Sequence, residues 1–360
     1  MTATLAPVRL NEVLRIARLR NASDVHLCPG TPPVLRVDGI LEQQHSMVPT
    51  EEELAAVANS LLPAGANALL QEKGDATIAQ RVDEVGSVRV HAYRTSRGTA
   101  LAIRLLATSV PSLESLHLPS IVTSFTEKPH GLVIVTGPTG SGKSTALAAM
   151  LDRINRTRSV HVVTIEDPIE YEHISDRSLV HQRELGRDVA TFAEAIYGAL
   201  RSDPDVILVG EMRDPLTMHA AITAAETGHL VLTTLHTGDA AQTIDRIVGV
   251  FAGDQQEQIR TQIAQTLVGV ICMRLLPRLH GHGRRPAVEV LVANDAVRNT
   301  IRDGKTHQIR NIMATSRQSG MQTLEAHLSD LIARREIAFE TARLVTQRQD
   351  DIRPSDRTLT

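Results

Sequence analysis

The clearest chemical signal in this chain is a glycine-rich segment that reads Gly137-Pro138-Thr139-Gly140-Ser141-Gly142-Lys143-Ser144-Thr145. The segment matches the phosphate-binding pattern in which a glycine and four free positions are followed by Gly-Lys-Ser/Thr. In that pattern backbone N–H groups surround phosphate oxygens, the lysine reaches the β- and γ-phosphates, and the serine hydroxyl binds Mg²⁺. We therefore predict that these residues bind ATP, with Lys143 on the phosphates and Ser144 on the metal.

The segments on either side of this loop fit that role. Residues 131–136 (GLVIVT) form a short apolar, β-branched run of the kind found in buried parallel strands. Residues 145–154 are rich in Ala, Leu and Met, which favour a helix. A strand, a glycine turn and a helix in this order place the positive end of the helix dipole beside the bound phosphates.

Three further apolar runs in the central region also end in polar residues that suit phosphate chemistry. The run 160–165 ends in an acidic cluster, the run 205–210 ends in Glu211, and the run 230–235 ends in His236. The acidic cluster consists of Glu166, Asp167 and Glu170. Ligands of open α/β sheets bind outside the carboxyl ends of the strands. We therefore expect all four strand ends to converge on one nucleotide.

Glu211 stands in an unusual context. Most phosphate-loop ATPases carry an aspartate at this strand end for the Mg²⁺ shell, followed by a glutamate that orients water. Here Gly210 stands where the aspartate is expected, so Glu211 is the candidate that positions or deprotonates the attacking water. The predicted Mg²⁺ ligands are then Ser144, Glu211 and Glu166. An alternative is that Asp167-Pro168 forms a turn and that the glutamates only cap a helix.

Two histidines flank the fourth strand run. His236 follows it directly and is a candidate hydrogen-bond donor to the γ-phosphate. His229 lies seven residues earlier, and an odd separation places side chains on opposite faces of a strand, so no metal pair is expected. A structural role is an equally good interpretation of His229. The preceding helix has clear end signals in Asp214, Pro215 and Gly228.

The length and composition of the chain exclude several classes of protein. At 360 residues the chain is long enough for two or three domains. Its net charge of −3 provides no basic excess for a phosphate backbone, so we expect no nucleic-acid partner.

No apolar run approaches the roughly 20 residues of a membrane span, and no signal-peptide pattern is present. Cys28 and Cys272 are the only cysteines, which indicates neither a disulfide framework nor a cysteine zinc site. We expect a cytoplasmic protein without direct membrane insertion.

Patterning along the chain predicts an α/β protein with several parts. An α+β domain is expected over 1–105, where Thr50 and Glu53 form a capping box, and a linker over 106–125. Strands and helices then alternate over 126–280, as in a parallel sheet with crossover helices. A mostly helical region is expected over 281–348, followed by a polar tail over 349–360.

These motifs together resemble the secretion and pilus-motor ATPase superfamily, and within it the PilT-like retraction ATPases of type IV pili. Four segments match the Walker A loop, the Asp box, the unusual Walker B and the His box, in this order: 137–145, 164–171 (TIEDPIEY), 205–214 (DVILVGEMRD) and 227–237. Three others resemble the start of the N-terminal domain, the AIRNLIRE motif associated with retraction, and the GMQTL motif: 22–39, 296–303 (AVRNTIRD) and 320–324.

The resemblance implies a RecA-like phosphate-loop core, a PAS-like N-terminal domain and a helical C-terminal region. It implies a homohexameric ATPase that powers pilus retraction and twitching motility, peripheral at the inner membrane through a pilus platform protein. ATP would lie between the N-terminal and RecA-like domains. Arginines of the N-terminal domain would complete the site, because guanidinium groups neutralise charge on a transferring phosphoryl group. The positions that match are Arg89, Arg97 and Arg104.

Some departures leave other members of the superfamily open. Residues 87–93 (SVRVHAY) lack one arginine of the related RFRVNAF, and Thr300 replaces an apolar residue. A pilus assembly or type II secretion ATPase is one alternative, but that class usually carries a longer N-terminal region and a tetracysteine zinc insert, and this sequence has neither. A regulatory subunit that binds ATP with little turnover is another. The presence of Lys143, Ser144, Glu166 and Glu211 argues against it.

Overall fold

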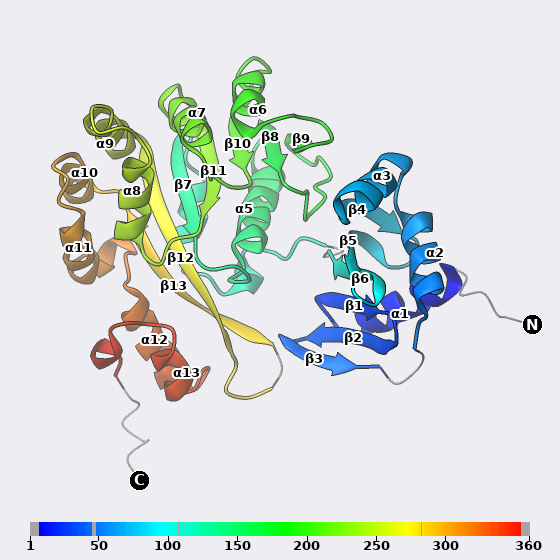
Figure 1. Cartoon of the computed structure of the whole chain (residues 1–360). Helices are drawn as coiled ribbons and strands as arrows, with labels where there is room; N and C mark the ends of the chain where they lie inside the picture. The colour runs from blue at the N-terminus through cyan, green and yellow to red at the C-terminus, as the bar shows by residue number, and fades with distance from the viewer. Residues whose placement is uncertain (1–6, 45–47, 107–108, 282, 354–360) are drawn as a thin grey trace, which may run out of the picture. The chain divides into compact units, whose positions relative to one another are not determined.

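The computed structural model describes residues 7–44, 48–106, 109–281 and 283–353, so the end of the expected tail, 354–360, lies outside the described residues. The chain divides into two compact units, Met1–Ser109 and Val110–Thr360 (Figure 1). Among the described residues, none of the helices combines the length and the apolar character that crossing a membrane requires.

Unit 1 is built on an antiparallel sheet. Its described strands number six and follow the order β3-β2-β1-β6-β5-β4. The elements are α1 (Pro7–Leu19), β1 (Asp24–Cys28), β2 (Thr31–Val37), β3 (Ile40–Gln43), α2 (Glu51–Leu61), α3 (Ala64–Lys73), β4 (Asp75–Val82), β5 (Gly86–Thr95) and β6 (Gly98–Leu105). The predicted capping box is confirmed, because Thr50 Oγ1 accepts from the Glu53 N–H and the Thr50 N–H donates to the Glu53 carboxylate.

The two faces of this sheet differ in chemistry because side chains alternate along each strand. Val88, Val90 and Ala92 of β5 are buried in a core shared with α1, α2 and α3. Arg89 and His91 alternate with these residues and are only half-buried. The sheet therefore has one apolar face and one polar face.

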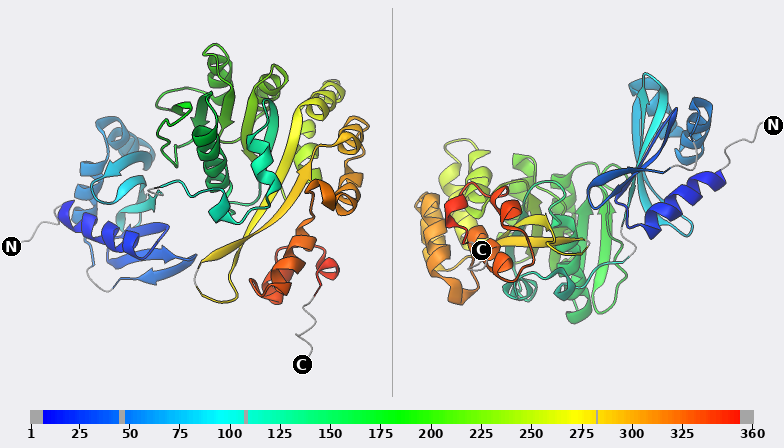
Figure 2. Two further views of the ribbon diagram at one scale, coloured as in Figure 1. Left: turned by 180° about the vertical axis from the view of Figure 1, so that it is seen from behind. Right: turned by 90° about the horizontal axis from the view of Figure 1, so that it is seen from below.

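Unit 2 contains an α/β sheet with helices on both sides (Figures 1 and 2). Its elements are η1 (Glu114–Leu116), α4 (Ile121–Thr126), β7 (Gly131–Thr136), α5 (Lys143–Thr157), β8 (His161–Glu166), β9 (Leu179–Glu184), α6 (Phe192–Ala199), β10 (Val206–Val209), α7 (Pro215–Glu226), β11 (Leu230–Leu235), α8 (Ala240–Gly249), α9 (Gln256–Thr266), β12 (Leu267–Pro277), β13 (Arg284–Val292), α10 (Asp295–Arg302), η2 (Thr306–Gln308), α11 (Ile309–Thr315), η3 (Arg317–Ser319), α12 (Leu324–Ala333), α13 (Phe339–Arg343) and η4 (Gln349–Asp351). The predicted α/β class is confirmed.

Parallel pairing places the carboxyl ends of most strands of unit 2 at the same edge of the sheet. The sheet has the order β13-β12-β7-β11-β10-β8-β9, and in the described part only β13 runs antiparallel to its neighbour. All the other strands pair in parallel, so their carboxyl ends meet at one edge. One core lies between this sheet and α4 and α5, and another between the sheet and α6 to α9.

The expected boundaries need three corrections. The region 281–348 is not helical from its start, because β13 pairs with β12 along most of its length. The second half of the expected linker belongs to unit 2, because Val122 and Phe125 are buried in its core. The expected tail starts with structure, since η4 is followed by Ile352, which is only 4% exposed. Each feature depends on contacts with distant residues, which local composition does not reveal.

Candidate functional site

The phosphate-binding loop encloses the ammonium group of Lys143. Lys143 Nζ donates to the carbonyl oxygens of Gly137 and Pro138 at 2.9 and 3.1 Å. Gly137 has a φ of +144°, and a side chain there would overlap the Met273 carbonyl oxygen, so this position requires glycine. Helix α5 begins at Lys143, after Gly142 in the left-handed region. The loop thus directs its lysine and a helix N-terminus into the same space.

The hydroxyl groups of the loop have different surroundings. Ser144 is exposed in the first turn of α5. Thr145 Oγ1 lies 2.9 Å from the Tyr171 hydroxyl, which ties α5 to the segment after β8. Ser141 Oγ is buried and has no hydrogen-bond partner within the described residues. Buried polar atoms are nearly always satisfied, so the unpartnered hydroxyl fits a loop that binds phosphate oxygens.

The structure brings the four predicted strand ends to one sheet edge. From the phosphate loop after β7, the next strand is β11 with His236, then β10 with Glu211, then β8 with Glu166. Helix α7 between β10 and β11 is confirmed as predicted, with Asp214 accepting from the Thr217 N–H and with Pro215 in the first turn. The sheet order therefore aligns the predicted site residues in a row.

Glu211 has two basic neighbours. Its Oε2 lies 2.6 Å from Arg213 Nε and 3.7 Å from His236 Nε2. Burial, followed by the positive charge of Lys143, lowers the pKa of His236 below its usual value, although Glu211 acts in the opposite direction. Burial likewise lowers the pKa of Lys143, again opposed by Glu211. The imidazole is therefore neutral at pH 7 and can donate one hydrogen bond.

His229 lies at the other end of β11 from His236. Its Nδ1 is 2.9 Å from the Ala224 carbonyl oxygen and 3.3 Å from Thr227 Oγ1. These contacts close the C-terminal end of α7. The structural interpretation of His229 therefore fits, and the two histidines do not share a site.

Gly210 allows β10 to approach β8 closely. A Cβ atom there would lie 3.3 Å from the Glu166 Cα and from the Ile165 carbonyl oxygen. The Gly210 N–H donates to that same carbonyl at 2.8 Å, and its own oxygen accepts from Thr234 Oγ1 at 2.6 Å. A side chain at this position, including that of an aspartate, would therefore crowd the backbone of β8 and require the two strands to move apart by a few tenths of an ångström.

Glu166 is held by its neighbours on the sheet. Thr164 Oγ1 donates to Glu166 Oε1 at 2.6 Å and Gln182 Nε2 donates to the same oxygen at 3.0 Å. Burial raises the pKa of the Glu166 carboxyl, and these two hydrogen bonds oppose the shift. A fixed carboxylate at a strand end is suited to orient a cation or a water molecule.

The segment after β8 is fixed to β9 without forming a helix. The Ile169 N–H donates to Glu184 Oε2 at 3.1 Å, and Gln182 Nε2 donates to the Tyr171 carbonyl at 2.9 Å. Between β8 and β9 the structure contains no helix. The alternative in which Glu166 and Glu170 cap a helix is therefore wrong. Glu170 lies close enough to Lys143 to oppose the lowering of its pKa.

The donor set at this edge fits Mg²⁺ with bound phosphates. Ser144, Glu166 and Glu211 offer hydroxyl and carboxylate oxygens, which are the ligands Mg²⁺ prefers. No group of three or more His, Cys, Asp or Glu in the described residues forms a cage of its own. Mg²⁺ usually binds through one or two carboxylates, water and substrate phosphates, so the arrangement is consistent with a metal that enters with the nucleotide.

The three candidate arginines of unit 1 do not form one cluster. Arg89 and Arg104 are opposite each other on β5 and β6, and Arg104 Nε lies 3.0 Å from Asp24 Oδ1. They line a cavity of about 340 Å³ on the polar face of the sheet. Arg97 lies in the turn of the same hairpin, roughly 20 Å farther along at the usual rise of a strand.

Several residues near the phosphate loop escaped the sequence analysis. Arg274 of β12 donates to the Met273 and Gly238 carbonyl oxygens, and Arg284 Nη1 lies 3.4 Å from the Gly140 carbonyl oxygen. Arg213 pairs with Glu211, and Gln182 orients Glu166. Strand β9 (LVHQRE) is too polar to be recognised as a strand of a parallel sheet. No sequence pattern therefore indicated that Gln182 lies beside Glu166. Arg213 could have been found, because it lies two residues after Glu211.

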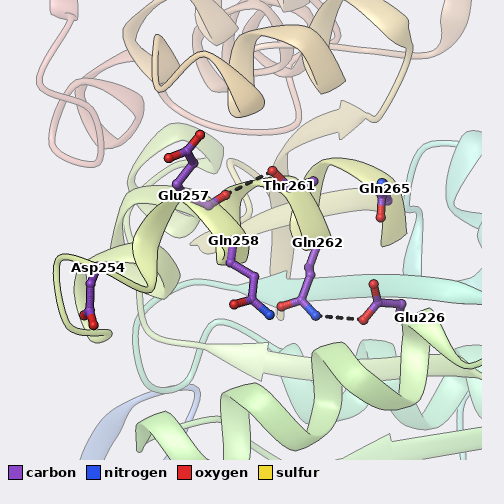
Figure 3. A pocket seen from close by; sticks show the side chains of 7 residues that line it. All are labelled: Glu226, Asp254, Glu257, Gln258, Thr261, Gln262 and Gln265. Atoms are coloured by element: carbon purple, nitrogen blue, oxygen red, sulfur yellow. Dashed lines mark hydrogen bonds between the residues drawn. The ribbon is translucent and has the colours of Figure 1, made fainter.

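A groove lined mostly by residues of two helices has unsuitable chemistry for a nucleotide. It measures about 500 Å³ and lies between α7 and α9 (Figure 3). Glu226, Asp254 and Glu257 contribute carboxylates to its lining, which includes no lysine or arginine among the described residues. Gln262 Nε2 donates to Glu226 Oε2 at 2.7 Å across it. Carboxylates repel phosphate groups, so this groove is not a second nucleotide site.

Comparisons with known proteins cover nearly the whole chain. A family model described as type II/IV secretion system protein matches residues 3–358. The twitching motility protein of Neisseria gonorrhoeae is 43% identical over 340 residues, or 94% of this chain and 91% of that protein. The type IV pilus retraction ATPase PilT of Pseudomonas aeruginosa is 41% identical over 334 residues, or 93% of this chain and 97% of that protein. A crystal structure of the pilus retraction motor PilT with bound ADP matches with a TM-score of 0.86 and 41% identity, and covers 95% of this chain and 98% of that one.

Proposed function

We propose, because this chain belongs to the family of type II/IV secretion system proteins, that it is an ATP-hydrolysing motor that powers the retraction of type IV pili. The observation that carries the proposal is the placement of Lys143, Glu211 and His236 at one sheet edge. This placement supports nucleotide hydrolysis. The two relatives named for twitching motility and pilus retraction support retraction, as opposed to assembly, of the pilus.

The proposed chemistry divides among the residues of this edge. Residues 137–145 would bind the phosphates, with Lys143 offsetting their negative charge. Ser144, Glu166 and Glu211 would hold Mg²⁺, which when bound neutralises charge on the transferring phosphoryl group. Glu211 would also position or deprotonate the attacking water, and neutral His236 would donate a hydrogen bond to the γ-phosphate.

The assembly is also part of the proposal. We propose a homohexamer in which arginines of unit 1 complete the ATP site, with Arg89, Arg97 and Arg104 as the candidates. The motor would be cytoplasmic and would act at the inner membrane through a pilus platform protein, without a nucleic-acid partner. The net charge of −3 supports the last point. Sedimentation with and without ATP tests the hexamer, and a species that stays monomeric would contradict it.

The alternatives are less well supported. An assembly or type II secretion ATPase usually carries a tetracysteine zinc insert, and Cys272 is the single cysteine between residues 110 and 360. A regulatory subunit that binds ATP with little turnover needs the lysine of the loop but not a carboxylate beside His236. Glu211 occupies that position here.

Deletion of the gene, followed by measurement of motility and surface pili, tests the function. Loss of a retraction motor leaves non-motile cells with excess pili, whereas loss of an assembly motor leaves cells without pili. Complementation with Glu211→Gln separates a motor from a regulatory subunit. If the variant restores motility as well as the wild type, hydrolysis by this chain is not required and the motor proposal fails.

A further inference from the structure

Arg274 lies in the strand next to the phosphate loop, just past the part of that strand that pairs with β7. Strand β12 pairs in parallel with β7, and Cys272 opposite Thr136 is the last pair of that ladder. Arg274 is therefore two residues beyond the pairing with β7, at the level of the phosphate loop, in the part of β12 that continues to Pro277. Since β12 runs in the same direction as the other nucleotide-edge strands, its carboxyl end joins the row that contains Lys143 and His236.

The guanidinium group of Arg274 is held by its own strand and by the loop that carries His236. Its Nη1 donates to the Met273 carbonyl at 3.0 Å, and its Nη2 donates to the Gly238 carbonyl at 2.9 Å. The Met273 carbonyl is the group that leaves no room for a side chain at Gly137. Gly238 comes two residues after His236. Arg274 is thus fixed between the start of the phosphate loop and the loop that carries His236.

The guanidinium of Arg274 forms no ion pair with a carboxylate within the described residues, whereas those of Arg213 and Arg285 in the same unit do. Asp239 and Glu289 are in its vicinity, since their charges and that of Arg274 act on the same Cys272 thiol. The positive charge of Arg274 also acts on Lys143 and contributes to the lowering of that pKa, behind burial. Two cations held close together repel each other, and an anion bound beside both removes the repulsion.

The remaining donors of Arg274 suit a phosphate group. A guanidinium carries five N–H donors in a planar fork, and contacts to Met273 and Gly238 use two of its nitrogens. Such a fork recognises phosphate oxygens with charge-assisted hydrogen bonds. Gly238 belongs to the loop that carries His236. A phosphate bound by Arg274 would therefore be connected to that loop through the hydrogen bond from Arg274 to the Gly238 carbonyl.

We propose that Arg274 binds the terminal phosphate of ATP from within the same chain and links the phosphate loop to the His236 loop when it does so. The residue thereby distinguishes ATP from ADP. This inference rests on the proposed function, because it takes ATP as the ligand.

The test compares affinities for a non-hydrolysable ATP analogue and for ADP, each measured by displacement of a fluorescent nucleotide. Arg274→Gln should weaken analogue binding at least about tenfold, the usual cost of one charge-assisted hydrogen bond, and change ADP binding less than about twofold. Arg274→Lys, which keeps the charge but not the fork, should fall between Gln and wild type for the analogue. Arg278→Gln is the matched control, because Arg278 is exposed just beyond β12 and loses the same charge.

Each outcome decides the inference. Equal losses for the analogue and ADP, or no loss for either, would overturn it. A thermal unfolding measurement shows whether Arg274→Gln folds. If it does not fold, the test rests on Arg274→Lys. The inference is then overturned if Arg274→Lys has the same ratio of analogue affinity to ADP affinity as the wild type. Failure of the wild-type protein to bind the analogue would instead refute the proposed function, whatever the variants do.

Discussion

Glu211 Oε2 lies 3.7 Å from His236 Nε2, so a carboxylate at the end of β10 faces an imidazole at the end of β11. The two strands are neighbours in the sheet, and Val209 of β10 is opposite Thr233 of β11. The Met212 N–H donates to the Thr234 carbonyl at 3.1 Å and fixes the chain just after Glu211. The pair is therefore positioned by backbone pairing, which makes its geometry rigid enough to act on a bound phosphate.

Replacing Glu211 should separate binding from hydrolysis. In Glu211→Gln the attacking water loses its proposed base, so we expect kcat to fall at least about 100-fold while nucleotide affinity changes little. Phosphate release and fluorescent-nucleotide binding measure the two quantities. Arg213→Gln is the control, because Arg213 pairs with Glu211 but its side chain is 71% exposed, and it should cost far less activity. Equal hydrolysis by wild type and Glu211→Gln would rule out the assignment.

Replacing Lys143 should abolish nucleotide binding. The ammonium lies inside the loop on the Gly137 and Pro138 carbonyls, so Lys143→Ala removes the main positive charge there. We expect affinities for ATP and ADP to fall more than about 100-fold. Lys128→Ala, a change at an exposed position, should bind as the wild type does. Retained affinity in Lys143→Ala would show that the phosphates bind elsewhere.

The protonation of His236 should determine how kcat/KM decreases at acidic pH, which is the acid limb of the pH profile. Burial and the charge of Lys143 lower the pKa of this histidine below 6.5, so the neutral imidazole persists into mildly acidic solution. If the neutral form is the active one, kcat/KM stays flat above pH 6.5 and falls only at lower pH. His236→Gln should lose this limb. A limb above pH 6.5 in the wild type would contradict the expected direction.

The contribution of Glu289 to stability should fall as pH rises, opposite in direction to that of half-buried His173, whose pKa is lowered to about 4. Glu289 Oε1 accepts from the Ala240 N–H at 2.8 Å and from Cys272 Sγ at 3.6 Å, and Asp239 and Glu325 add negative charge. Burial raises its pKa from 4.5 to about 7. The folded state therefore favours the protonated form, and the corresponding stability is present below pH 4.5 and lost as pH rises through about 7.

The size of this effect is on the order of 3 kcal/mol between pH 4.5 and 8. Urea unfolding at several pH values measures it. Glu289→Gln keeps an acceptor for the Ala240 N–H and should remove the Glu289 contribution, so the stability difference between wild type and variant should change with pH by this amount, whereas Glu257→Gln at an exposed position should follow the wild type. The same pH dependence in Glu289→Gln as in the wild type would locate the effect at another group.

Adding a methyl group at Gly210 should disturb the neighbouring strand. The new Cβ would lie 3.3 Å from the Glu166 Cα, which is backbone and cannot rotate away. We expect Gly210→Ala to cost about 1–3 kcal/mol of unfolding free energy and to lower kcat through a shifted Glu166. Gly249→Ala, which meets nothing within 4 Å, is the control and should be near neutral. A Gly210→Ala variant as stable and active as wild type would show that the strands adjust freely.

Much of the site could be predicted from the sequence because its signals are local. The phosphate loop, the strand before it and the helix after it are encoded within residues 131–157, and the loop glycines have no substitute at their backbone angles. The start of α7 followed from Asp214 and Pro215 in the same way. Glu211 and His236 could be singled out because each directly follows an apolar run.

Only the tertiary structure decided which strands are neighbours, since strand order depends on contacts between residues far apart in the chain. That order places His236 beside the phosphate loop and Glu211 beside His236. It also brings Arg274 to the nucleotide edge, although more than 100 residues separate it from Lys143. Gln182 and Glu289 likewise lie in strands whose roles no local pattern indicated. The sequence by itself determined a nucleotide-binding loop, and long-range strand pairing decided which side chains surround it.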